Sequence, residues 1–521
     1  MTKFESLHHD RVLGSIKTFD RLIFKGHLLR FFPKGRFSCF LWRQNVRLKD
    51  FKHYVPKVTE KIKVHVLGLA KQAGRPYIYL KSAMTKASGK SKEDLARQIA
   101  QEDGIDEGLV CILGVVEPCR SFVVEYDAET GRLEAVRKPR KCMHFYAYLI
   151  DREFGWMHVR LQSWFPFEIQ IYINGREWLA RQLDLHGINY KRYENTFLWI
   201  ENMAVAEQLC EKFRRRKLYR VLVHFGSWMN PLLGKIRRLG YGSYYWVADQ
   251  AEYATDIMFR NRESLMFLLE DLFEHATLYF SSEDVMRFLG RKLNGNFKGE
   301  LTTDQKRRPE GVRVKHRMKR NSIKIYDKWS VLRVETTINN PREFKVLRVD
   351  DTPTGRKRRW VPMGKGVCNL WRYAQVSAQA NARYLDALAQ APAKGEFVRD
   401  LDDLCRSRIV NGKRYAKFNP VAADTAALFA AVLAGEHSLN GFRNRDLAVR
   451  LDPELLDRSP QMRRRFGARV SRLIAKLRGH GLVSKVKDSR LYRVTQRGHC
   501  AMGAVLRFRG VDFPAACRQA L

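Results

Sequence analysis

Three carboxylates have the residue type and spacing to do chemistry. Asp249, Glu252 and Asp256 recur at i, i+3 and i+7, which would place them on one face of a helix. Clustered carboxylates raise one another's pKa or require a cation, and nucleases hold Mg²⁺ in this way. Asp327 and Glu335 could join them if the fold brings their strands near. The alternative is a solvated acidic face, or pairing with the many arginines of the chain, and the composition favours it.

A basic strand is predicted in the middle of the chain. Residues 306–328 hold ten Lys or Arg against two acids, and four of these cations alternate with mostly apolar residues: Arg313, Lys315, Arg317 and Lys319. At a period of two, one face of the strand is basic and the other mostly apolar. Like charges in a row repel, and a bound polyanion would relieve that repulsion; a solvated face is the alternative. The basic run 355–359, followed by Trp360, could extend this surface. The aromatic residues interleaved with the cations could stack on unpaired bases, although core packing is commoner for aromatics.

A basic helix followed by a basic hairpin lies near the end of the chain. In 461–482, five apolar residues recur at helical spacing: Phe466, Val470, Leu473, Ile474 and Leu477. A basic stripe with the same period lies beside them: Arg465, Arg469, Arg472 and Lys476. The next segment predicts two short strands with basic residues on both arms: Lys485, Lys487 and Arg490. This order is the layout of a winged helix-turn-helix, in which one helix enters the major groove and the wing contacts the backbone.

Two segments of this region, RVSRLIAKLRGHGLVSKV and SRLYRVTQRG, resemble bacterial winged-helix domains of the MarR-like family. The resemblance covers most of 424–510 and implies duplex DNA binding. The four helix cations would then lie in or along the groove, and the three wing cations would contact phosphates, which position the domain without reading sequence. Winged helices also serve as protein-interaction modules and some bind RNA, so these alternatives stay open.

The pair IKIYDK and VLRVETTIN resembles a hairpin of phage and plasmid replication initiators, in which YDK precedes LRxE. The resemblance covers only these residues, and it implies DNA nicking by a tyrosine and a metal. In those proteins a His-hydrophobe-His strand commonly holds the metal, whereas the nearest candidate here, around His158, has one histidine. Tyr373 and Tyr384 lie on a predicted helix, as a nucleophile could, although a core or surface tyrosine is the commoner role.

Composition limits the partners. The 521 residues carry a formal net charge of +41, which calls for an anionic partner, and nucleic acid fits better than membrane. No stretch approaches the 18 uncharged apolar residues that a membrane helix requires, and the first residues lack the apolar core of a signal peptide. The nine cysteines never form C-x-x-C, which argues against zinc fingers and a disulfide framework and favours a reducing cytoplasm.

The patterns together predict an α+β multi-domain protein with an antiparallel sheet region, a helical middle that includes a helix over 248–259, and a C-terminal winged helix-turn-helix. The predicted segments are 1–60, basic and partly helical; 61–200, α+β; 201–300, mainly helical; 301–365, basic antiparallel β; 366–423, helix and linker; and 424–521, winged helix.

We therefore expect a cytoplasmic nucleic-acid-binding protein that contacts duplex DNA through two basic surfaces, in regulation or mobile-element replication, with no membrane partner. One alternative is a metal-dependent nuclease or replication initiator, and only this one requires Mg²⁺ as a cofactor. The other is a protein that binds structured RNA. The sequence does not predict an oligomeric state or a target site.

Overall fold

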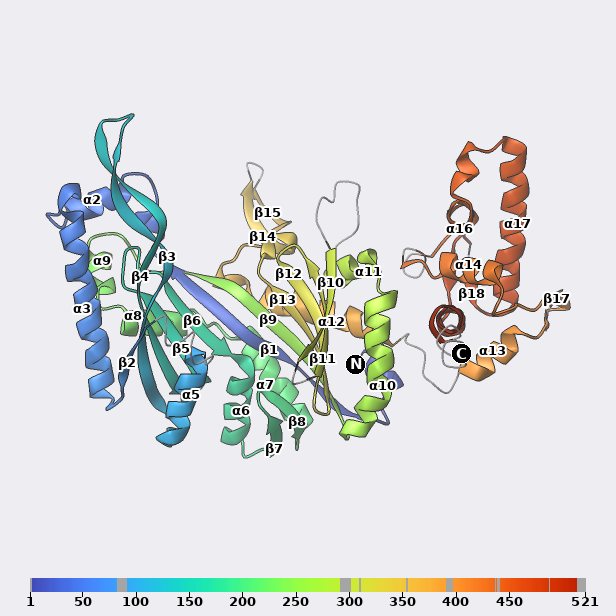
Figure 1. Cartoon of the computed structure of the whole chain (residues 1–521), viewed down its shortest axis with the longest axis horizontal. Coiled ribbons are helices and arrows are strands. Elements are labelled where there is room, and N and C mark those ends of the chain that lie inside the picture. Colours follow the sequence, from blue (N-terminus) through green and yellow to red (C-terminus); the bar gives the residue numbers. More distant parts are fainter. Residues whose placement is uncertain are drawn as a thin grey trace.

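Eleven strands form one sheet, and the chain is a mixed α+β protein built around it (Figure 1). All neighbouring strands pair antiparallel except β2 and β3, which are parallel. The order across the sheet is β10 (Leu301–Arg308), β11 (Gly311–Met318), β12 (Asn321–Lys328), β13 (Val331–Ile338), β9 (Tyr245–Phe259), β1 (Val12–His27), β6 (Ile169–Asn174), β5 (Gly155–Gln162), β4 (Arg132–Asp151), β3 (Gly108–Asp127) and β2 (Tyr77–Leu80). The computed structural model describes residues 2–81, 91–290, 301–308, 311–352, 355–389, 397–435, 437, 441–486 and 488–512.

Most helices cover one face of this sheet, and α5 (Lys92–Glu102) packs on the other face, over β3. α3 (Phe51–Gln72) and α8 (Tyr219–Met229) pack over β3, β5 and β6, and α12 (Leu370–Leu388) packs over β9 and β13. α3 has a helical apolar stripe, and its buried side chains meet those of the strands in one core. The opposite face is polar around β12, β13, β9 and β1. The other elements of this part are α1 (Lys3–Leu7), α2 (Arg36–Trp42), α6 (Gly175–Leu185), β7 (Tyr190–Tyr193), β8 (Thr196–Ile200), α7 (Met203–Arg215), α9 (Leu233–Arg238), α10 (Arg262–Glu274), α11 (Ser282–Phe288), β14 (Lys345–Thr352) and β15 (Gly355–Pro362).

Several elements agree with their local sequence signals. Strands β3 and β4 form a hairpin around an Asp-Ala-Glu-Thr-Gly turn at residues 127–131, whose residue types are typical of a tight turn. The Asp127 carboxylate accepts hydrogen bonds from the Glu129 amide and the Thr130 hydroxyl, at 3.0 and 2.9 Å, and these bonds close the turn. Asn174 caps α6 by accepting from the amide of Arg176 at 2.8 Å, as expected for an N-cap asparagine.

The two central strands differ from the prediction. Residues 248–259 do not form a helix but belong to strand β9, which lies between β1 and β13. Likewise, the segment 1–60 contains strand β1 in addition to its helices. Strand β9 is buried along most of its length, and about half of the residues of β1 are buried, in an irregular order around residues 18–20, so neither strand shows one continuous alternation of polar and apolar residues. Pairing with β1 and β13 therefore overrides the local helical spacing of residues 248–259.

The basic β segment over 301–365 is antiparallel, as predicted, but it is not a separate unit. Strands β10 to β13 continue the large sheet beyond β9. Only β14 and β15 form a sheet of their own, a two-stranded ribbon. The expected basic strand is therefore part of the same surface as β9 and β1.

Residues 397–512 form a cluster with its own hydrophobic core (Figure 1). The five predicted apolar residues of α17 all pack in or against this core. Arg507 joins the cluster to the rest of the chain through ion pairs with Asp271, at 3.3 Å, and Glu274, at 3.0 Å. The elements are α13 (Phe397–Leu404), β16 (Arg408–Val410), β17 (Lys413–Tyr415), α14 (Ala423–Val432), α16 (Asn444–Leu451), α17 (Pro460–Gly479), β18 (Val483–Lys485), β19 (Tyr492–Val494) and α18 (Gln496–Arg507).

Among the described residues, no helix combines the length and apolar character needed to cross a bilayer.

Buried histidines make the fold sensitive to acid. His316 contacts the hydroxyls of Thr303 and Tyr384, both at 2.9 Å, and burial lowers its pKa to about 4. The unfolded chain takes up this proton near pH 6.5 but the native state does so only near pH 4, so stability falls as pH decreases between these values. His316→Gln should therefore reduce the loss of unfolding free energy between pH 7 and pH 5 by about 2 kcal/mol, measured by urea denaturation. An unchanged pH dependence would contradict the assignment of a neutral His316.

Candidate metal centre

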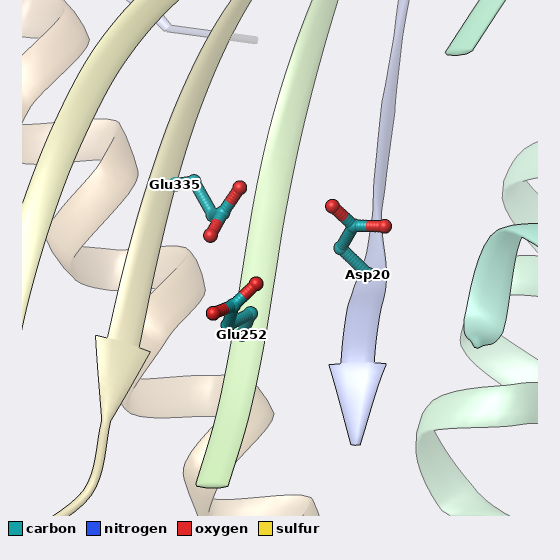
Figure 2. A group of neighbouring side chains, drawn as sticks. All are labelled: Asp20, Glu252 and Glu335. Carbon is teal, nitrogen blue, oxygen red and sulfur yellow. The ribbon is translucent and has the colours of Figure 1, made fainter. Parts of the chain in front are cut away.

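Three carboxylates from three neighbouring strands converge on the polar face of the sheet (Figure 2). Asp20 lies on β1, Glu252 on β9 and Glu335 on β13, and one oxygen of each lies within 4.8 Å of the other two. Asp20 and Glu335 are buried, and Glu252 is partly exposed. Mg²⁺ binds oxygen at about 2.0–2.1 Å, so two ligands of one ion lie roughly 3–4 Å apart. The limit of 4.8 Å is slightly wider than this range, so a small inward shift of the side chains would let the three groups share one cation.

A bulge in β1 contributes to this convergence. Phe19 pairs with Tyr253 and Leu22 pairs with Ala251, so that two residues of β1, at 20 and 21, oppose the single residue 252 of β9. Such a two-against-one arrangement re-aims side chains locally and is common beside active sites. Here it directs Asp20 toward the polar face while Phe19 and Leu22 both stay in the core under the helices.

The electrostatics of the centre favour a bound cation. Burial, and then the negative charge of Glu335, raises the pKa of Glu252 to about 7, although Lys324 and Arg21 act in the opposite direction. Burial alone would also raise the pKa of Asp20, but the guanidinium groups of its buried neighbours hold it below its usual value. At neutral pH the cluster thus holds carboxylates that repel each other, and a divalent cation would relieve this repulsion.

Two protein groups hold the Glu335 carboxylate in place. The Tyr326 hydroxyl donates to Oε2 of Glu335 at 2.7 Å. Nζ of Lys324 lies 2.8 Å from Oε1, but in an orientation that makes an ion pair rather than a hydrogen bond. Oε1 accepts no hydrogen bond from any residue that the structure describes, although it is buried. The Lys324 ammonium is the close partner of this oxygen among the described residues, and a bound cation would compete with that ion pair.

Asp20 is held by a network of buried polar groups. Nη1 of Arg333 donates to it at 3.2 Å, and the Asn195 amide donates at 2.8 Å. Arg333 has no exposed surface and also binds Asp256 through two hydrogen bonds, at 2.7 and 2.9 Å. Tyr326, Arg333 and Glu335 belong to the YDK and LRxE motifs, so the residues that carry the initiator resemblance surround the carboxylates.

Cations line the same face of the sheet beside the carboxylates. Lys315 on β11 pairs across the sheet with Lys324 on β12, and Lys324 pairs with Glu335 on β13. Arg313 and Arg317 share the face of Lys315, because the residues between them are buried on the helix-covered side. We call Arg313, Lys315 and Arg317 the cationic row. Burial lowers the pKa of Lys315, and the neighbouring cations lower it further, so an anion would be favourable here.

Two features modify the predicted basic strand. Lys319 does not belong to the row: it lies in the turn after β11, with a positive φ of 55°, and its Nζ lies 3.1 Å from Glu343. Asp304 on β10 lies 3.7 Å from both arginines of the row and offsets part of their charge. Arg317 is exposed, whereas Arg313 and Lys315 are half-buried.

The predicted trio of Asp249, Glu252 and Asp256 is not a site, because these residues lie on a strand rather than on a helix face. Only Glu252 enters the centre. Asp256 is clamped by the buried side chains of Arg176 and Arg333, which is the arginine pairing considered as the alternative. Asp249 forms ion pairs with Lys25, at 3.0 Å, and Lys365, at 2.9 Å.

Of the two further carboxylates that the sequence analysis named, Glu335 and Asp327, one belongs to the centre and the other does not. Glu335 joins the centre, as the sequence allowed if the strands lay near each other. Asp327 alternates with Tyr326 along β12, so it points to the opposite face. The sequence interpretation missed Asp20. Its signal was a charged pair, Asp20 and Arg21, inside the apolar run of residues 19–24.

The C-terminal cations that the sequence analysis named as DNA contacts lie mostly on the surface. The exposed ones are Arg465, Arg469 and Arg472 on α17, and Lys485 and Arg490 in the hairpin region. Lys476 is half-buried: its ammonium lies 3.9 Å from the centroid of the Phe418 ring, and burial lowers its pKa. Lys487 lies outside the described residues. The structure does not bring any of these cations to the carboxylates.

Three residues from the initiator comparison lie elsewhere. His158 stacks on Tyr172, with ring centroids 5.2 Å apart, and burial lowers its pKa to about 3, so it is neutral at pH 7. Tyr373 and Tyr384 are fully buried in α12, on the helix-covered side of the sheet. Neither tyrosine can reach a substrate on the polar face.

Comparison with known proteins adds no assignment. The chain matches no protein-family model, no curated protein and no solved structure. Its function must therefore be inferred from the residues and geometry of the carboxylate centre and the basic surfaces.

Proposed function

We propose that this chain binds DNA and cleaves its phosphodiester backbone with a divalent metal held by Asp20, Glu252 and Glu335. One observation carries the proposal: the carboxylates and the cationic row lie on the same face, with Lys324 between them. Carboxylates alone would fit a cation, and cations alone would fit a polyanion. Carboxylates and cations side by side are suited to bind a polyanion and to cleave its backbone next to a metal ion. Non-catalytic DNA binding, which the basic patterns favour by themselves, leaves the carboxylate centre without a role.

Each group then has a definable task. A bound Mg²⁺ or Mn²⁺ would polarise a phosphate oxygen and lower the pKa of a bound water. Arg317 and Lys315 would hold phosphates along the strand, and Lys324 would stabilise negative charge that develops beside Glu335. Arg333 fixes the orientation of Asp20 through its buried hydrogen bond.

The C-terminal helices and hairpin supply a second DNA contact in this proposal. We propose a winged-helix module in which α17 enters the groove and the hairpin contacts the backbone. The exposed arginines of α17 and the packing of its apolar face support this role. Two basic surfaces on one chain would raise affinity through effective concentration.

Incubation of supercoiled plasmid with the full chain tests the proposal. We expect nicked circles with Mg²⁺ or Mn²⁺, none with EDTA, and none with Asp20→Asn. Competition between labelled duplex DNA and structured RNA, at matched ionic strength, distinguishes DNA from RNA as substrate. Binding without cleavage under every metal condition would leave a non-catalytic binder, and preference for RNA would support the RNA-binding alternative.

Substitution of the cationic row by glutamine, as R313Q/K315Q/R317Q, should weaken DNA binding about equally for all sequences, because phosphate contacts carry no sequence information. The slope of log affinity against log salt should fall by about 0.9 for each lost phosphate contact. Fluorescence anisotropy over a salt series measures both effects.

A matched control uses three exposed cations on the helical side of the molecule, as K212Q/K217Q/R220Q. Both triple variants lose the same net charge. Equal losses of affinity would mean that the total charge, rather than the row, determines binding.

A further inference from the structure

The β14–β15 ribbon carries an exposed face that the metal centre does not explain. The pairing places Leu347 opposite Trp360 and Val349 opposite Arg358, so these four residues share one face. The exposed fractions are 40% for Leu347, 59% for Val349 and 54% for Trp360. The ribbon projects from the large sheet beside β12 and β13 (Figure 1). This face is apolar and aromatic, with an arginine at its edge.

The base of the ribbon is fixed to the strand that carries Glu252. The amide of Ala248 donates to the Lys365 carbonyl at 2.8 Å, just after β15 ends. Arg348, on the other face of the ribbon, donates to the Asn369 side chain at 2.7 Å. The base of the ribbon is therefore anchored beside the region of the metal centre.

The surroundings of Trp360 indicate what covers this face. Cζ of Arg372 lies 5.0 Å from the centroid of the Trp360 ring, and Arg358, Arg359 and Lys345 are exposed on the ribbon. A protein partner would match the apolar residues but not this density of cations. Duplex DNA would match the cations, but its bases are stacked on each other. An unpaired nucleotide offers both a planar base and a phosphate.

We propose that the ribbon binds unpaired nucleotides of the DNA strand that the metal centre cleaves. A base stacks on the Trp360 indole, and flanking phosphates contact Arg358 and Lys345. The inference rests on the proposed function, because it takes DNA as the substrate. It adds that the DNA next to the cleaved bond is single-stranded.

Anisotropy of fluorescein-labelled oligothymidylate and of a labelled blunt duplex, both in EDTA, tests the inference with the full chain. We expect Trp360→Ala to weaken oligothymidylate binding about 5- to 150-fold, which corresponds to one stacked base, and to change duplex binding by less than about twofold. Trp360→Phe should retain most of the affinity, because it keeps an aromatic ring. Trp42→Ala is the matched control: Trp42 is 76% exposed on α2, at the far end of the sheet.

Wild-type affinity of Trp360→Ala for oligothymidylate would overturn the inference, and so would an equal loss for the duplex. Absence of oligothymidylate binding by the unaltered chain would also overturn it. Because EDTA prevents metal-dependent cleavage, these results do not depend on the metal centre. Tight binding of oligothymidylate through Trp360 by a chain that never nicks plasmid would sustain the ribbon assignment and reject the cleavage proposal.

Discussion

Glu252→Gln is expected to reduce metal-dependent cleavage roughly 100-fold or more. The substitution removes one ligand of a metal ion that would lower the activation free energy by several kcal/mol. The same variant should make the metal-free protein more stable. Because the folded pKa of Glu252 is raised to about 7, its charged form is unfavourable in the native state above that pH. At pH 8 in EDTA, the free energy of unfolding should rise by about 1–3 kcal/mol, and at pH 5 the gain should largely vanish.

Asp249→Asn is the matched control, because Asp249 lies on the same strand but outside the carboxylate centre. It should leave plasmid nicking unchanged. Thermal unfolding with and without Mn²⁺ gives a second readout: the ion should raise the melting temperature of the unaltered chain and of Asp249→Asn, but not of Glu252→Gln. Stabilisation of all three by Mn²⁺ would place the metal elsewhere.

Arg333→Met is expected to lower the free energy of unfolding by about 3–5 kcal/mol, the usual cost of leaving a buried charge without its partner. The substitution removes the hydrogen bonds to Asp20 and Asp256, both of which are buried. Arg333 helps to hold the pKa of Asp20 below its usual value, so it contributes stability at neutral pH that disappears as Asp20 becomes protonated in acid. The deficit of the variant should therefore persist from pH 7 down to about pH 4 and shrink only below the ordinary pKa of an aspartate.

Urea denaturation at several pH values measures this deficit. Arg317→Met is the control for side-chain loss alone, because Arg317 is exposed, and it should change stability by less than about 0.5 kcal/mol. Arg333→Lys should recover only part of the loss, since an ammonium cannot form the paired hydrogen bonds to Asp256. A small, pH-independent effect of Arg333→Met would show that the buried network is not a source of stability.

Local signals predicted those parts of the fold in which neighbouring residues determine the structure. The apolar face of α17 was predicted in this way, and the β3–β4 turn and the Asn174 cap also follow their local residue types. Strands β1 and β9 were not predicted, because bulges and buried runs interrupt the alternation of polar and apolar residues in their sequences. The centre of the sheet is set by contacts between segments that are more than 200 residues apart.

The candidate site could be predicted only in part for the same reason. Glu252 and Glu335 were candidates from their residue types, and the cationic row followed from a period of two. Their association with Asp20 depends on strand order and register, which no local pattern encodes. The trio containing Asp249 arose because i, i+3 and i+7 spacing has meaning on a helix and none on a strand.

The pairing of residues 20 and 21 against residue 252 gives β1 one residue more than regular pairing with β9 requires. Loss of the Arg21 codon, in frame, would close the bulge and leave Phe19 and Leu22 two positions apart, so both would keep their place in the core while the direction of the Asp20 side chain would change. A substitution at the same position changes one side chain and leaves the rest of β1 in place.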